Sequence, residues 1–382
     1  MKANATHNSK GITDEQIIDC LKRGLNHSQA AEELGCSRHN IRNRKAKLIR
    51  QGLWQHGNGN DTVPEPYYVK GKSQYYDKDG KPAGVWVKSD IDKEKQHKMM
   101  EEAIIAMCEE IPKHKPSNSL PKNTLSDLLN CYVISDYHLG MMAWGEESGA
   151  DWDLKIAEET LIKWFQQAIK LSPDSKTAIF CNLSDALHWD GLEAVTPANR
   201  HVLDADTRFQ KVVRVCIRLF RKIIDMLLQK HEKVVMINVG GNHDPASTVW
   251  LREMFHSFYS ENERVVVDNG ADLYCCYEHG ATSLFFHHGH KRKVGNIDSV
   301  FAAKYRDVFG RTKYSYAHMG HLHSVDVKET NLMLIEQHRT LAAPDAYASQ
   351  GGWISGRDAK VITYHKDYGE VSRVVVGIDM IS

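Results

Sequence analysis

The chain has 382 residues, of which 42% are hydrophobic and 26% charged, and this is the ordinary composition of a soluble globular protein. Such a length accommodates one large domain and a small one. The 49 basic residues balance 49 acidic residues, which excludes a strongly basic molecule. Any binding of nucleic acid must therefore come from local basic patches.

Cysteine usage and hydropathy indicate a cytoplasmic protein. The eight cysteines form no Cys-x-x-Cys pair, which favours reduced thiols over a disulfide framework. No apolar leader opens the chain, and no apolar run approaches the length of a membrane span. We therefore expect a cytoplasmic location and no membrane partner.

Residues 1–53 are predicted to form a small all-α domain of three short helices. Thr13 and Gln16 form a capping box for the first helix, Ser28 is placed to open the second, and the third covers residues 37–50. A helix-turn-helix requires small and branched residues at set positions around its turn, and three residues have that spacing: Ala31, Gly35 and Ile41.

The third of these helices carries six cations and no acid. Cations neutralise phosphates, while Arg and Asn side chains can read base edges in a major groove. The alternative is a solvated basic helix in a domain that binds other proteins. The candidate nucleic-acid contacts on this helix are Arg38, His39, Asn40, Arg42, Asn43 and Arg44.

Residues 54–123 are interpreted as an arm that joins a recognition domain to a catalytic one. A hairpin is expected over residues 73–90 with its turn at Asp79 and Gly80, followed by a helix over residues 92–111. The aromatic residues of the hairpin would pack against a neighbouring domain or stack on bases.

The remaining segment, residues 124–382, is predicted to be an α/β domain. Apolar runs alternate with amphipathic helices and are followed by paired strands, which indicates two packed sheets with helices outside. Helices are expected over residues 153–171, 209–231 and 247–260, and strands over residues 176–182, from Val234 onward, and as a pair over residues 264–287.

Five apolar runs in this domain end in polar residues that carry carboxylate, imidazole or amide groups. The run that begins at Val234, for example, passes through Gly240 and Gly241 into an amide, an imidazole and a carboxylate. Carboxylate, imidazole and amide groups without a thiolate suit a divalent first-row metal such as Mn, Fe or Zn. These chain positions are Asp136, His138, Asp185, Asn242, His243, Asp244, His287, His288, His290, His321 and His323.

Two local expectations follow from the spacing of these residues. Asp136 and His138 are two positions apart, so both side chains would leave the same side of an extended backbone. His287 would face the opposite side of its strand from His288 and is interpreted as a core imidazole.

The order D-Y-H, S-D, G-N-H-D, H-G-H and G-H-L-H resembles the calcineurin-like metallophosphoesterase superfamily. The resemblance covers residues 131–326. It implies a four-layer sandwich of two mixed β-sheets flanked by helices, here preceded by the small helix-turn-helix domain. One position departs from the family pattern, because Ser184 stands where the family has Gly before the shared aspartate, Asp185.

The resemblance also implies two metal ions and their ligands. Asp185 would bridge the ions, which lower the pKa of a bridging water so that hydroxide attacks phosphorus in line. His243 would act as general acid on the leaving oxygen, with Asp244 orienting it. Manganese is the expected ion, with iron or zinc as alternatives. One ion would be held by Asp136, His138, Asp185 and His323, and the other by Asp185, Asn242, His288 and His321.

The substrate is predicted to be DNA, with the chain similar to the SbcD-type nuclease branch and to phage-encoded members of the superfamily. A helix-turn-helix tethered to the catalytic domain favours a polymeric substrate. The cations Lys291, Arg292 and Lys293 follow a ligand strand, where they would meet a phosphate backbone. The alternatives are a phosphomonoesterase or small-nucleotide phosphodiesterase, and a DNA-binding regulator with an inert phosphoesterase body. The loop over residues 340–356 would close part of the cleft or mediate a homodimer.

Overall fold

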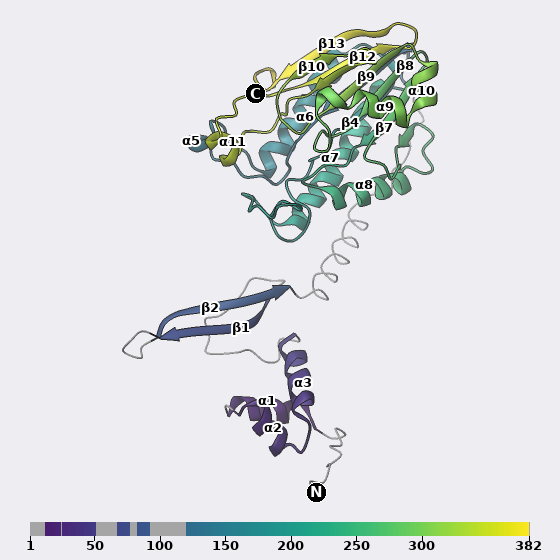
Figure 1. The fold of residues 1–382 in the computed structure, drawn as a ribbon. Coiled ribbons are helices and arrows are strands. Elements are labelled where there is room, and N and C mark those ends of the chain that lie inside the picture. Colours follow the sequence, from purple (N-terminus) through teal and green to yellow (C-terminus); the bar gives the residue numbers. More distant parts are fainter. Residues whose placement is uncertain (1–11, 24, 51–66, 77–81, 92–119, 382) are drawn as a thin grey trace. The chain divides into compact units, whose positions relative to one another are not determined.

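A computed structural model describes residues 12–23, 25–50, 67–76, 82–91 and 120–381. The chain divides into two compact units, Met1–Cys108 and Glu109–Ser382. The first unit contains helices and a hairpin, and the second contains the sheets that carry the predicted ligands (Figure 1).

Three helices of the first unit match the predicted segments, namely α1 (Asp14–Lys22), α2 (His27–Glu33) and α3 (Arg38–Arg50). Thr13 and Gln16 form the predicted capping box. The second cap differs from the prediction, because Asn26 rather than Ser28 opens α2. The Asn26 side chain accepts the backbone N–H groups of Ser28 and Gln29, at 2.9 and 3.1 Å, and these donors have no partner within a helix.

These helices enclose a small core of their own. Ala31 and Ile41 are buried in it, and Gly35 has φ +59°, a left-handed conformation that glycine adopts without steric cost. Of the three residues that define the predicted turn, Gly35 lies in the short connection between α2 and α3, while Ala31 in α2 and Ile41 in α3 pack in the core. The core consists of Ile17, Cys20, Leu21, Ala30, Ala31, Cys36, Ile41 and Leu48.

Both strands of the predicted hairpin are present. Strand β1 (Tyr67–Tyr76) pairs antiparallel with β2 (Pro82–Ile91), so both strands are longer than predicted. The predicted turn at residues 79 and 80 and the predicted helix over residues 92–111 lie outside the described residues.

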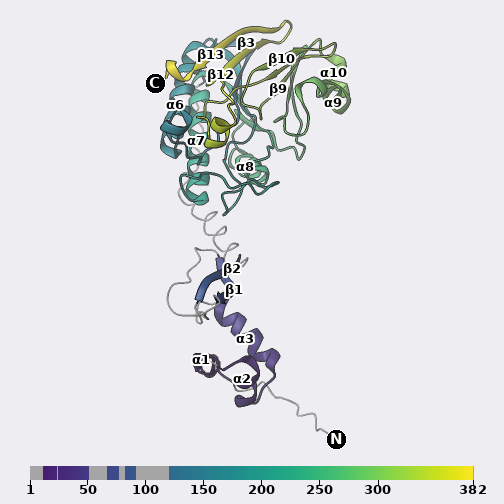
Figure 2. The same ribbon diagram turned by 60° about the vertical axis from the view of Figure 1, so that its left-hand side comes forward.

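The second unit contains two mixed sheets. Figures 1 and 2 show this unit from two sides. The larger sheet has the order β13-β12-β3-β4-β5-β6, and the smaller β10-β11-β9-β8-β7. The larger consists of β3 (Leu125–Ile134), β4 (Ser175–Asn182), β5 (Lys233–Asn238), β6 (Val265–Val267), β12 (Asp358–His365) and β13 (Gly369–Gly377). The smaller consists of β7 (Cys275–His279), β8 (Thr282–Phe286), β9 (Tyr314–Met319), β10 (Asp326–Glu329) and β11 (Leu334–Gln337).

Helices cover the outer faces of both sheets, which confirms the predicted fold class. Residues of the two sheets, such as Val133 and Leu284, pack together in one buried cluster. The larger sheet is covered by α6 (Leu154–Leu171), α7 (Phe209–Lys230) and α8 (Pro245–Phe258). The smaller sheet packs on Phe301 of α9 (Asp298–Lys304) and is flanked by α10 (Arg306–Arg311).

In the second unit, the start of one helix and the pairing of one strand differ from the sequence prediction. Helix α8 begins at Pro245, two residues earlier than predicted, because proline suits the first position of a helix, where its missing N–H is not needed. Strand β6 pairs parallel with β5 in the larger sheet, whereas β7 and β8 form a hairpin in the smaller one.

In the described part of the chain, no helix is both long and apolar enough to cross a membrane.

A network of buried polar side chains joins the two sheets. The His318 ring lies 2.9 Å from His338 Nε2 and 3.0 Å from the Tyr364 hydroxyl, while Glu336 pairs with Lys360 and Arg373. Burial lowers the pKa of His318 to about 4, although Glu336 opposes the shift. The ring is therefore neutral in the folded protein at pH 7.

We predict that replacing His318 by Gln reduces the loss of stability on acidification. The folded pKa of about 4 lies below the ordinary 6.5, so the unfolded chain binds a proton first as the pH falls. This contribution is complete above pH 6.5 and amounts to about 3 kcal/mol in the wild type, of which about 2 kcal/mol is lost by pH 5. Urea unfolding in chelator at pH 7.5 and pH 5 measures the difference.

The exposed His256 of α8 provides the matched control. His256→Gln should retain the wild-type loss of unfolding free energy between the two pH values. Equal losses in the wild type and in His318→Gln would contradict the assignment of a neutral, buried His318.

Candidate metal centre

The predicted ligands lie at strand ends that meet at one edge of each sheet. Strands β3, β4 and β5 are parallel, so the loops after them leave from the same edge of the larger sheet. Strands β8 and β9 are parallel in the smaller sheet. The first three loops carry Asp136, His138, Asp185 and Asn242, and the other two carry His288, His321 and His323.

The backbone of these loops is left-handed at most of the critical positions. Among the described residues, eight non-glycine residues have positive φ, and six of them lie here: Asp136, His138, Ser184, Asp185, His321 and His323. Such conformations cost free energy and concentrate at functional sites where surrounding contacts impose them. The contacts here include hydrogen bonds from the Asp136 N–H to the Ser184 carbonyl, at 3.0 Å, and from the His138 N–H to the Asp185 carbonyl, at 2.9 Å.

This geometry corrects one sequence expectation. Asp136 and His138 do not follow one another on an extended strand, because β3 ends at Ile134 and the two residues have φ values of 49° and 50°. Both side chains nevertheless reach the site, since the loop is folded back against the loop that carries Asp185.

The first ligand group consists of Asp136, His138 and His323, whose ligand atoms lie within 4.8 Å of one another. His323 Nε2 lies 3.3 Å from His138 Nε2 and 3.3 Å from Asp136 Oδ1. Asp136 Oδ1 is buried and accepts no hydrogen bond, whereas Oδ2 accepts the His321 N–H at 2.9 Å. A buried carboxylate oxygen left without a donor is an atom ready to bind a cation.

The second group consists of Asp185, His288 and His321. His288 Nε2 lies 3.0 Å from both Asp185 Oδ2 and Asn242 Oδ1. His288 Nδ1 donates to the Leu183 carbonyl at 2.7 Å, which fixes the ring with Nε2 towards the carboxylate. Burial opposes a charge on this ring, but Asp185 and Asp136 raise the pKa of His288 to about 10.

The two groups adjoin, because His288 Nε2 is also 3.9 Å from Asp136 Oδ1. The structure thus brings together the seven residues that sequence reasoning selected as ligands. Oxygen and imidazole donors in this number, with a buried carboxylate oxygen among them that accepts no hydrogen bond, fit two divalent cations.

Asp185 is held in place by its neighbours' backbone. Its Oδ1 accepts the N–H groups of Asn242 at 3.0 Å and His243 at 2.9 Å. A Cβ atom at Gly241 would overlap both Asp185 Oδ1 and Ser184 Oγ, so only glycine allows this approach. The glycine before the Asn-His-Asp sequence is therefore required by contact with the carboxylate.

Asp244 has a different role from the predicted one. It was expected to orient His243, but its buried carboxyl group accepts the Ser184 hydroxyl at 2.8 Å and the N–H groups of Asp185 and Leu187 at 3.2 and 3.1 Å. Burial and the charge of Asp185 raise the pKa of Asp244 to about 7. Asp244 thus fixes the loop that carries Asp185.

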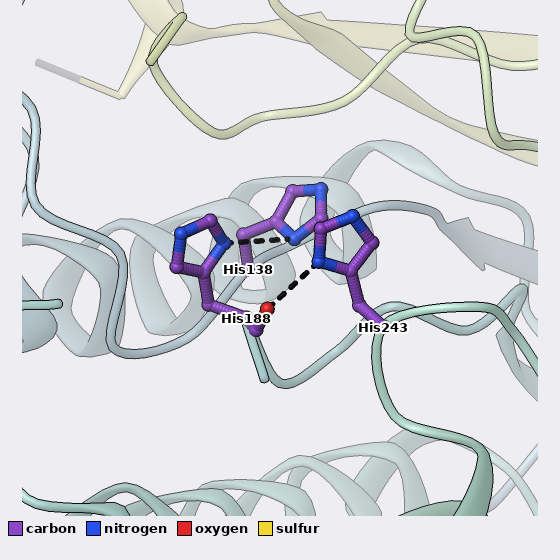
Figure 3. A group of neighbouring side chains, drawn as sticks. All are labelled: His138, His188 and His243. Atoms are coloured by element: carbon purple, nitrogen blue, oxygen red, sulfur yellow. Dashed lines mark hydrogen bonds between the residues drawn. The ribbon is translucent and has the colours of Figure 1, made fainter. Parts of the chain in front are cut away.

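His188 contacts both His138 and His243 and is a residue of the candidate site that sequence reasoning missed. His243 Nδ1 donates to the His188 carbonyl at 2.7 Å, and the two rings are nearly parallel with centroids 5.7 Å apart (Figure 3). His188 Nδ1 lies 3.4 Å from His138 Nδ1, so one residue orients both a ligand and the candidate acid (Figure 3). The available signal was a histidine three positions after Asp185.

The remaining predicted contacts lie outside the ligand groups. His287 is buried, with its ring 4.5 Å from Tyr274, in keeping with the predicted core imidazole, and 5.7 Å from His290. The cations at residues 291–293 are exposed.

On α3, the candidate contacts divide into exposed and engaged side chains. Arg38, His39, Arg42 and Asn43 are exposed, and Asn40 is half-buried. Arg44 instead pairs with Asp14, with Nε to Oδ1 at 3.0 Å, and so ties α3 to α1.

Comparisons with known proteins find similarity only among solved structures. No family model and no curated protein matches. A conserved protein from Streptococcus pneumoniae TIGR4, described as a predicted phosphoesterase, is 13% identical over 65% of this chain and 98% of its own, with TM-score 0.28. A novel archaeal phosphodiesterase is 12% identical over 65% and 99%, with TM-score 0.32. A 5'-nucleotidase from Candida albicans SC5314 is 13% identical over 68% and 54%, with TM-score 0.34.

These likenesses are too weak to carry an argument about activity. The class is defined by the chain itself, because two mixed sheets flanked by helices present clustered Asp and His ligands at adjoining strand ends. The second unit is therefore an α/β fold of two mixed sheets with buried candidate sites for divalent metal ions.

We predict that Ser184→Ala is less stable than Ser184→Gly, although Ala resembles Ser more closely. Ser184 has φ +80°, and both Ser and Ala bear the cost of a Cβ in that conformation, about 1 kcal/mol. Gly removes this cost, while both variants lose the hydroxyl that donates to Asp244. Urea unfolding in the presence of a chelator should place Ala about 1 kcal/mol below Gly.

The chelator makes the comparison independent of metal affinity. A Ser184→Ala protein as stable as Ser184→Gly would show that the left-handed conformation imposes no cost at this position.

Proposed function

We propose that this chain is a dimetal phosphodiesterase that cleaves DNA. The observation that carries the proposal is the position of Asp185, whose ligand atom groups with those of His288 and His321 beside the group of Asp136, His138 and His323. Its Oδ1 is fixed by two backbone donors, and its Oδ2 faces His288. This arrangement suits a carboxylate shared by two cations.

The protein's own groups can perform the remaining steps. Two divalent cations, when bound, supply a water of lowered pKa and neutralise charge on the phosphate. His243 holds its Nδ1 proton on the His188 carbonyl, so Nε2 is the ring nitrogen left to give a proton to the leaving oxygen. The His188 carbonyl thereby keeps the His243 ring in one orientation. The entropy of ordering this ring is therefore lost before the substrate binds.

A DNA substrate is supported by basic side chains in both units. Lys291, Arg292 and Lys293 are exposed directly after the loop of His288, where they can neutralise phosphates flanking the one that is cleaved. In the first unit, α3 exposes Arg38 and Arg42 on a helix that follows a tight turn. We infer that this unit binds duplex DNA in the manner of a helix-turn-helix.

We predict that Asp185→Ala loses bound metal and DNA cleavage together. The variant removes the carboxylate shared by both ligand groups, so the full-length protein should retain less than one tenth of the wild-type manganese after gel filtration. Mass spectrometry of metals and cleavage of labelled single- and double-stranded DNA with Mn²⁺ measure the two losses. Identical cleavage by variant and wild type would mean a contaminant.

His243→Ala is the matched variant, because His243 belongs to neither of the two ligand groups that contain a carboxylate and clusters only with the imidazoles of His138 and His188. It should retain manganese and lose cleavage, by about 100-fold or more for loss of a general acid. Release of inorganic phosphate from nucleotides without cleavage of oligonucleotides would replace the nuclease proposal with a phosphomonoesterase.

We predict that Arg42→Ala weakens duplex DNA binding by the full-length protein. An exposed Arg that contacts a phosphate or base contributes about 1 to 3 kcal/mol, so affinity should fall roughly tenfold. Fluorescence anisotropy at fixed salt, with a chelator to prevent cleavage, gives the dissociation constant. Lys22→Ala, an exposed cation of α1, is the control, and equal effects of the two substitutions would exclude specific contact by α3.

A further inference from the structure

Three large aromatic side chains are exposed on two neighbouring segments of the second unit. Trp144, Tyr347 and Trp353 are 60%, 68% and 59% exposed, and we call them the aromatic rim. Trp144 precedes α5 (Gly145–Ser148), and the other two lie in and after α11 (Ala346–Gln350), which adjoins α5 (Figure 1).

Hydrogen bonds hold the two segments of the rim together. The Ser349 hydroxyl donates to the Glu147 carbonyl at 2.8 Å, and the rings of Tyr347 and Trp353 meet edge to face with centroids 5.0 Å apart. Exposed apolar groups scattered singly are ordinary, but aromatic rings clustered on one surface mark a place where something binds. The rim is therefore a candidate contact surface.

Both segments of the rim are connected to the metal centre along the chain. Trp144 follows the ligand His138 by six residues. The segment that leads to α11 begins against the site, because the Thr340 hydroxyl donates to the Asp136 carbonyl at 2.6 Å.

Two of the acidic groups beside the rim, Asp345 and Asp151, are engaged by local donors. The Asp345 carboxylate accepts the Ala348 N–H at 2.8 Å as the cap of α11, and the Asp151 carboxylate accepts the Gly145 N–H at 2.6 Å at the start of α5. Their charge is thus partly compensated at the two helix ends. Glu146 and Glu147 are exposed beside Trp144, so their charge disfavours a phosphate at this place. The ring faces instead favour contact with a planar, uncharged group.

We propose that the aromatic rim stacks on unpaired bases of the DNA strand whose phosphodiester lies at the metal centre. The inference rests on the proposed function and deepens it, because it makes the substrate single-stranded or a frayed duplex end. In a duplex the base faces are already stacked on one another, so only an unpaired strand offers them to aromatic side chains. One strand then places its phosphates at the metals and its bases on the rim.

The test compares two substitutions of Trp353 in the full-length protein with Mn²⁺. Trp353→Leu keeps an apolar side chain without a ring, and Trp353→Phe keeps a ring. With a ten-residue oligothymidylate, which lacks a duplex groove for α3, the KM should rise about tenfold or more in the Leu variant and less than threefold in the Phe variant. Circular dichroism confirms that both variants fold.

Tyr368→Leu is the matched control, because Tyr368 is 67% exposed and stands at the opposite end of the larger sheet. The register places it there, since Lys360 of β12 pairs with Val133 at the site end of β3, whereas His365 pairs with Leu128 at the other end. This variant should have the KM of the wild type. An equal rise for Tyr368→Leu and Trp353→Leu would overturn the proposal.

Two further outcomes separate the rim from the enzyme activity. Methyl p-nitrophenyl phosphate is a diester without a nucleobase. If the wild type hydrolyses it while Trp353→Leu has the wild-type KM for the oligothymidylate, the rim proposal fails and the phosphodiesterase stands. If the wild type hydrolyses neither substrate, the proposed function itself fails. A change in sedimentation of Trp353→Leu with an unchanged KM would make the rim a contact between copies of the chain and overturn base stacking.

Discussion

The burial of two carboxylates beside each other, Asp136 and Asp185, is the constraint to which the rest of the site responds. Neither group is exposed to water, and like charges at such a depth raise the free energy of the fold unless cations or donors compensate them. Backbone N–H groups occupy one oxygen of each carboxylate, and imidazole rings surround the other. The loops after five strands meet because each contributes part of this compensation.

The same constraint explains why the backbone is left-handed where the ligands lie. A turn that aims both an N–H group and a side chain at one carboxylate cannot continue the extended path of its strand, and the chain accepts unfavourable φ values instead. At Ser184 the cost of the left-handed backbone is accompanied by a favourable contact, because the Ser184 hydroxyl donates to Asp244. Asp244 in turn accepts the N–H of Asp185, while the Asp185 carboxylate accepts the N–H groups of Asn242 and His243. The two carboxyl groups therefore tie together the loops after β4 and β5.

Local order around the site extends from the ligands to the surface in a continuous series of contacts. His188 connects His138 with His243, and the hydroxyl of Thr340 connects Asp136 with the segment that forms α11 and the aromatic rim. Groups that would contact a substrate therefore share the rigid support that positions the ligands. Such shared support lowers the entropy that must be lost when a strand of nucleic acid is bound and aligned.

The sequence by itself determined the class of the fold and the chemistry of the site. Alternation of apolar strands and amphipathic helices is a local property, and the polar residues at strand ends meet whenever parallel strands share an edge. Tertiary structure alone decided the partners of Asp244, the place of His188 between two other histidines and the pairing of Arg44 with Asp14. These contacts join residues 30 or more positions apart, or depend on left-handed turns, and no spacing along the chain encodes which side chain a loop will face.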